Sequence, residues 1–97
     1  MILEVAVLYV RPGEGENFRR DFAGAQKIIA SMPGYVEHDL QHCVEDANRY
    51  ILLVRWETLE DHTFDFRESP QYLEWKKLLH HYYDPFPVVQ HYESITF

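Results

Sequence analysis

The spacing of hydrophobic and polar positions changes several times along the chain, and each change marks a predicted element. Residues 2–10 form a nearly continuous aliphatic run closed by a Pro-Gly pair, which predicts a central strand covered on both faces. Residues 14–32 switch to helical spacing, with apolar side chains on one face and charges over much of the rest, and Pro33-Gly34 ends the segment. We expect an amphipathic helix lying on a sheet.

The next two segments predict a hairpin. Residues 35–43 alternate as a strand does, with Tyr35, Glu37 and Asp39 on one side and His38 and Leu40 on the other. A polar turn follows, and residues 50–57 return as a β-rich strand.

The last third predicts two helical pieces and a strand. Thr58 and Asp61 have the spacing of a capping box, and Ser69-Pro70 places a cap residue before a proline at the first helical position. The second piece carries an apolar face, two prolines then break it, and residues 88–96 are the expected final strand. That apolar face consists of Tyr72, Trp75, Leu79 and Tyr82.

The element order is therefore β-α-β-β-α-β over one domain, residues 1–97, which predicts an α+β, ferredoxin-like protomer with a four-stranded antiparallel sheet. Two helices cover only one face of such a sheet. Because the strands are apolar on both sides, a second copy of the chain is the expected cover of the other face, and the two sheets would then close into a dimeric α/β barrel.

Composition narrows the choice of partners. Nine basic residues against sixteen acidic ones give a net charge of -7, and the basic residues are scattered, so nucleic acid is not an expected partner. No apolar stretch reaches the roughly 20 residues of a membrane span, and the N-terminal run contains Glu4 and lacks a signal-peptide pattern. A single cysteine, Cys43, suits a reducing cytoplasm.

Six histidines suggest a metal, but their spacing does not support one. His38 and His42 share a strand face at a separation of roughly 13 Å, which is too far for one ion. His80 and His81 diverge on a helix. Cys43 is better explained as a small edge residue than as a nucleophile. We expect no metal and no other cofactor.

What is left is a group of aromatic residues and histidines in the second half of the chain, which could line a cleft or simply fill the core. Within it, His62 stands one helical turn before Phe66, and a histidine of near-neutral pKa beside an apolar cavity could take a proton from a phenol. We select His62 and His91 as candidate catalytic bases. The candidate substrate-binding residues are Trp56, Phe66, Tyr72 and Tyr82.

Several of these residues also carry a family resemblance. A strand ending in Trp56-Glu57, the Ser69-Pro70-x-Tyr72 helix start with an internal tryptophan, Pro85-x-Pro87, and a last strand with His91-Tyr92 occur in that order. This succession resembles the antibiotic biosynthesis monooxygenase family of small dimeric α/β barrels. The resemblance implies oxidation of phenolic, quinol or polyketide-like aromatic molecules by O₂ without a cofactor.

The resemblance also separates branches of the family. Its haem-degrading members use an asparagine, a tryptophan and a histidine at places that correspond here to Ala6, Phe66 and Lys76, so haem is not expected. Quinol-oxidising members carry a histidine shortly before the Ser-Pro turn, where this chain has Asp65-Phe66-Arg67 and the nearest histidine is His62. The alternatives to an oxygenase are a non-catalytic or stress-related small-molecule binder and a purely structural dimer.

Overall fold

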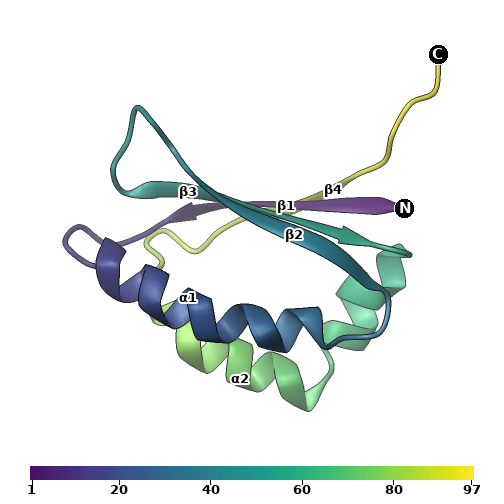
Figure 1. Ribbon diagram of the computed structural model, residues 1–97, viewed down its shortest axis with the longest axis horizontal. Helices are drawn as coiled ribbons and strands as arrows, with labels where there is room; N and C mark the ends of the chain where they lie inside the picture. The colour runs from purple at the N-terminus through teal and green to yellow at the C-terminus, as the bar shows by residue number, and fades with distance from the viewer.

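The computed structural model describes all residues, 1–97, and consists of a sheet with two helices on one side (Figure 1). Its elements are β1 (Ile2–Tyr9), α1 (Gly15–Ala30), β2 (Tyr35–His42), β3 (Arg49–Trp56), the π-helical η1 (Asp61–Phe66), α2 (Pro70–Leu79), the 3-10 turn η2 (His80–Tyr82) and β4 (Val89–Tyr92). The four strands pair antiparallel in the order β2-β3-β1-β4. The predicted ferredoxin-like α+β fold is confirmed.

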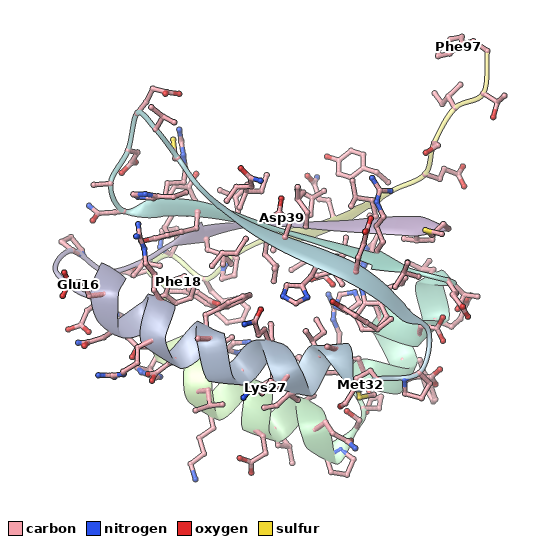
Figure 2. All side chains as sticks on the ribbon, in the orientation of Figure 1. Glu16, Phe18, Lys27, Met32, Asp39 and Phe97 are labelled. Carbon is pink, nitrogen blue, oxygen red and sulfur yellow. The ribbon has the colours of Figure 1, made fainter.

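The core lies between the sheet and the helices because alternate residues of β1 and β3 point toward α1 and α2. Phe18 of α1 is fully buried and points at the sheet, whereas Glu16 and Lys27 point away from it (Figure 2). Burial of the apolar side chains in this core is the main favourable contribution to the free energy of folding. The other face of the sheet is covered by nothing in the single chain.

Both predicted helix starts are confirmed by their hydrogen bonds. The backbone N–H of Thr58 donates to Oδ2 of Asp61 at 2.9 Å, and the N–H of Asp61 donates to Oγ1 of Thr58 at 3.2 Å, so the box is reciprocal. Oγ of Ser69 accepts from the N–H of Tyr72 at 3.1 Å, and Pro70 occupies the first turn of α2.

A close approach before η1 requires glycine. Gly34 has a φ of 81°, and a Cβ built on it would meet the carboxyl group of Asp61 at 2.1 Å. The turn into β2 therefore packs directly against the start of the helical segment that carries His62.

Two sequence expectations are wrong in detail. The expected alternation in β2 fails at its start, because a register shift between Tyr35 and Glu37 leaves Val36 as an extra residue and puts Tyr35 on the same side as His38, where the two hydrogen-bond. The final strand covers only Val89–Tyr92, since Tyr92 already pairs with Leu3 near the start of β1 and little partner strand is left beyond it.

Candidate functional site

Strand register brings the central polar residue of the site into place. Glu4 lies on the inward face of β1, in line with the core residues Ala6 and Leu8, and is 5% exposed. Across the β1–β4 ladder its direct partner is His91. On the other side, Trp56 ends β3 and reaches diagonally to donate its indole N–H to Oε1 of Glu4 at 3.0 Å. A carboxyl group thus stands in the core with one neutral donor.

The π-helical turn of η1 delivers a histidine to the same carboxyl. The N–H of Arg67 donates to the carbonyl oxygen of His62, a bond spanning five residues, and this wider turn buries both His62 and Phe66. Nε2 of His62 lies 3.3 Å from Oε1 of Glu4, and its ring stacks on Trp56 with centroids 5.5 Å apart. Residues from β1, β3 and η1 therefore converge on one point.

The two candidate bases are in direct contact. Nδ1 of His62 lies 2.7 Å from Nε2 of His91, a hydrogen bond in which either ring can be the donor according to its tautomer. His62 is 3% exposed, whereas His91 is half-buried on the edge strand. The series Glu4, His62, His91 thus runs from the protein interior toward the surface.

Burial shifts the ionisation of these groups in opposite senses. Loss of solvent raises the pKa of Glu4 to about 7, partly offset by the hydrogen bond from Trp56 and the charge of Arg67. Burial lowers the pKa of His62 to about 3, with the charges of Arg67 and His91 acting in the same direction. Burial also lowers the pKa of His91. The near-neutral pKa that we expected for His62 is found for Glu4 instead. His62 and His91 are neutral at pH 7.

A cavity of about 400 Å³ opens beside this series, between the sheet and α2. Its walls are mostly apolar, with β1 and β3 on one side and the aromatic residues Phe66, Tyr72 and Trp75 on the other. The polar residues that line it are Glu4, His62, Arg67, His80 and Tyr83. Its volume and its few polar groups are typical of a small-molecule site.

One polar atom in the cavity wall has no partner. Nδ1 of His80 is buried and makes no hydrogen bond within the protein. Burial also raises the pKa of the nearby Tyr83 phenol, so Tyr83 is a neutral donor or acceptor at physiological pH. An orphaned ring nitrogen is costly unless a ligand or water satisfies it.

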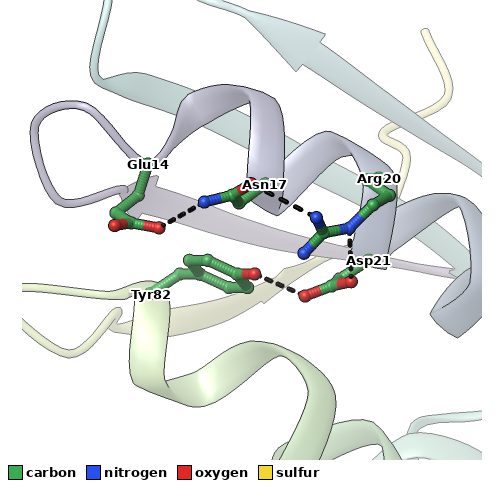
Figure 3. A network of polar contacts seen from close by, with 5 residues as sticks. All are labelled: Glu14, Asn17, Arg20, Asp21 and Tyr82. Atoms are coloured by element: carbon green, nitrogen blue, oxygen red, sulfur yellow. Dashed lines mark hydrogen bonds and ion pairs between the residues drawn. The ribbon is translucent and has the colours of Figure 1, made fainter.

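The structure distributes the sequence-predicted residues unevenly. His62, Phe66 and Tyr72 line the cavity. Trp56 and His91 do not line it, but each contacts a residue that does, Glu4 and His62 respectively. Tyr82 lies apart from the cavity: its hydroxyl donates to Asp21 in a polar network on α1 (Figure 3), and its ring packs on Phe18.

Sequence reasoning missed three of the polar lining residues. In the sequence, Glu4 stands out only as a charge within an apolar run, His80 only as a possible metal ligand, and Arg67 has no feature of a site residue. One usable signal was present, since a lone carboxyl at an inward position of a central strand marks a buried ionisable group. Two further histidines have partners elsewhere: His38 contacts Gln26, and His42 contacts Arg19.

The chain matches the family model described as antibiotic biosynthesis monooxygenase over residues 1–78. It is 47% identical over 95 residues to the uncharacterized protein YczJ of Bacillus subtilis (strain 168), covering 98% of this chain and 100% of that one. A putative antibiotic biosynthesis monooxygenase from Bordetella bronchiseptica superposes with a TM-score of 0.93 at 33% identity, covering 98% and 97% of the two chains. The protein belongs to the antibiotic biosynthesis monooxygenase family.

A more distant likeness is one of fold. SnoaB from Streptomyces nogalater, described as a cofactor-independent oxygenase, superposes with a TM-score of 0.74 at 21% identity over 99% of this chain and 94% of its own.

Two further structural findings concern membrane helices and metal ligands. No helix is long and apolar enough to cross a membrane. No three histidine, cysteine, aspartate or glutamate side chains are grouped so as to hold a metal ion.

Proposed function

We propose that the protein is a cofactor-independent monooxygenase that oxidises a small phenolic or quinol molecule in the 400 Å³ cavity. The observation that carries the proposal is an apolar cavity with a hydrogen-bonded histidine pair and a buried carboxyl at one side. Deprotonation of a phenol in such a site yields an electron-rich anion that can reduce O₂. The family membership and the fold shared with SnoaB support the same reaction class.

The reaction balances without an external reductant. A hydroquinone and one O₂ give a hydroxyquinone and one water, so the substrate supplies all four electrons that O₂ accepts. One oxygen atom enters the ring and the other leaves as water. The proton removed from the phenol at the start is returned to the departing oxygen, and the protein needs only to hold it in the meantime.

Two polar positions in the cavity suit a molecule with two oxygens. Ring contacts run from His62 to Phe66, from Phe66 to Tyr72, and from Tyr72 to His80, so aromatic walls separate the His62 end from His80. A quinol with one hydroxyl at Glu4 could place its second oxygen at the unpartnered Nδ1 of His80. Phe66 and Tyr72 would bind the ring faces.

The working form would be a homodimer. On the uncovered face of the sheet, Val5 pairs with Leu53 and Val7 with Ile51, and polar residues of β2 flank this apolar stripe. The C-terminal tail, with exposed Ile95 and Phe97, leaves the sheet on the side away from the helices (Figure 1). Apolar area of this kind is typical of a face that a second subunit covers.

A reducing cytoplasm, suggested by the unpaired Cys43, is the proposed location.

The proposed oxygenase activity is tested by aerobic incubation with a panel of hydroquinones and polycyclic phenols. Oxygen uptake is recorded, and the masses of the products are determined by mass spectrometry. The proposal predicts uptake above the uncatalysed rate and a product with one added oxygen for at least one compound. Saturable binding of these compounds without oxygen uptake would instead favour a small-molecule-binding protein. A cavity that binds none of them would favour the structural-dimer alternative.

A further inference from the structure

We infer that Glu4 is the catalytic base that touches the substrate, and that His62 and His91 form a proton-holding pair behind it. This assignment rests on the proposed function and deepens it. It replaces a histidine base with a buried carboxylate, a residue type and position that the family resemblance did not suggest.

Hydrogen-bond geometry is the first reason. Both ring nitrogens of His62 already have neighbours, Oε1 of Glu4 at 3.3 Å and Nε2 of His91 at 2.7 Å. A histidine in that position has no free nitrogen to offer a substrate. Glu4 differs, because Trp56 and His62 both approach the same oxygen, Oε1, and leave Oε2 unengaged by either.

Position is the second reason. Glu4 itself lines the cavity, whereas His91 does not. The carboxyl group is almost fully buried, so in its ionised form it lacks the water that would otherwise weaken it as a base. Its hydrogen bond from Trp56 fixes its orientation, and a fixed orientation is what a general base requires.

The pair behind Glu4 can take the proton on from the carboxyl group and carry it toward the surface. When Glu4 carries the phenolic proton, that proton can pass from the carboxyl to Nε2 of His62 while the proton on Nδ1 of His62 passes to Nε2 of His91. His62 changes only its tautomer, Glu4 returns to the carboxylate form, and the positive charge appears on the half-buried His91. Reversal of these transfers returns the proton for release of water.

The environment of Glu4 sets the pH at which the base is available. Two titratable or charged groups lie near Glu4: His62 of η1, which approaches Oε1, and Arg67, which directly follows η1. The more distant groups that face Glu4 are His91 of β4, Tyr72 of α2 and Tyr83 after η2. Since burial raises the pKa of Glu4 to about 7, the rate should rise as pH increases through that value.

The first arm of the test needs no substrate. The ¹³C resonance of the Glu4 side-chain carboxyl, assigned by its absence in Glu4→Gln, is followed against pH in the wild-type protein. The inference predicts a midpoint near 7, with the ¹⁵N shifts of His62 and His91 moving at the same midpoint. A midpoint near the ordinary pKa of 4.5 would overturn the assignment of Glu4 as the base, whether or not the protein oxidises a quinol.

The second arm uses a hydroquinone that the wild-type protein oxidises. Glu4→Gln, which can still accept the Trp56 hydrogen bond, is expected to lower kcat about 100-fold, while the exposed Glu57→Gln leaves it unchanged. Trp56→Phe removes a bond that favours the carboxylate, so it is expected to move the midpoint of the kcat profile to higher pH.

The outcomes distinguish failure of the Glu4 assignment from failure of the proposed oxygenase function. A Glu4→Gln variant with full activity would overturn the assignment of Glu4 and leave the oxygenase proposal standing. Wild-type protein that oxidises no compound of the panel would overturn the oxygenase and, with it, the role of Glu4 as a catalytic base.

Discussion

Glu4 and His91 are direct partners across the β1–β4 ladder, and His62 fills the space between their side chains, 3.3 Å from the carboxyl and 2.7 Å from the second imidazole. Three residues distant in sequence thus form one continuous series of polar contacts. Glu4 and His62 line an apolar cavity.

Activity should depend on both histidines and not on a metal. We expect His62→Ala and His91→Ala each to lower oxygen consumption at least roughly tenfold, because each interrupts the pair that accepts the proton. Treatment with EDTA should leave the rate unchanged. Steady-state oxygen-electrode measurements check both, with His81→Ala, an exposed histidine outside the site, as the matched control. Loss of activity on chelation, or full activity in both variants, would contradict the mechanism.

Removing the Glu4 charge should change how stability depends on pH. The pKa of Glu4 is raised from 4.5 to about 7 in the folded protein, so between these values the unfolded chain releases a proton that the folded chain keeps. Wild-type stability therefore falls, relative to Glu4→Gln, by about 1.4 kcal/mol per pH unit as pH rises through that window. Urea denaturation of both proteins at several pH values measures the difference.

A constant difference between the two free energies of unfolding from pH 4.5 to 7 would mean that Glu4 titrates normally. The comparison with Glu4→Gln is needed because the pKa of His62, lowered to about 3, contributes the opposite slope below 6.5 in the wild-type protein. The two slopes largely cancel in wild type, since the neutral pair holds as many protons as the unfolded ion pair.

Trp75 should be important for stability. It is 6% exposed and packs between Phe22 and Phe66, with ring centroids 5.9 and 5.8 Å away. Trp75→Ala should lower the free energy of unfolding by about 3 to 5 kcal/mol, as large-to-small core substitutions do. Leu73→Ala on the outer side of α2, 66% exposed, should change it by less than about 0.5 kcal/mol. Equal stability of wild type and Trp75→Ala would mean that the ring serves only as cavity wall.

The uncovered face of the sheet should form the dimer interface. Leu53→Lys places a charge in the middle of that face and should convert a particle of about twice 11.7 kDa into a monomer. Leu73→Lys, on the opposite side of the molecule, should leave the mass unchanged. Sedimentation at micromolar concentration distinguishes the species. A monomeric wild-type protein would leave the apolar stripe without an explanation.

The sequence predicted local structure better than it predicted the site. The two helix starts are predictable from spacing alone, because each depends on hydrogen bonds between residues three positions apart. These bonds join Thr58 to Asp61 and Ser69 to Tyr72. The extra residue at Val36 is not readable, because it reflects how β2 meets β3. His62 was found because an imidazole near an apolar stripe is conspicuous.

Glu4 was overlooked as a site residue for a different reason. Its contacts depend on the pairing of β1 with β4, on the end of β3 and on the π-helical turn of η1, three features that lie 52 or more residues away. Tyr82 was selected for its helical spacing, but the change from α2 to a 3-10 turn rotates it toward α1, where Asp21 accepts its hydrogen bond.

Cofactor-independent oxygenation is tested most directly by turnover of a hydroquinone under ¹⁸O₂ by EDTA-treated protein, with product mass and oxygen consumption measured together. One O₂ should be consumed for each product formed, that product should contain one ¹⁸O atom, and Glu4→Gln should lose the activity. A product without ¹⁸O, or no consumption of O₂ by the wild-type protein across the panel, would contradict it.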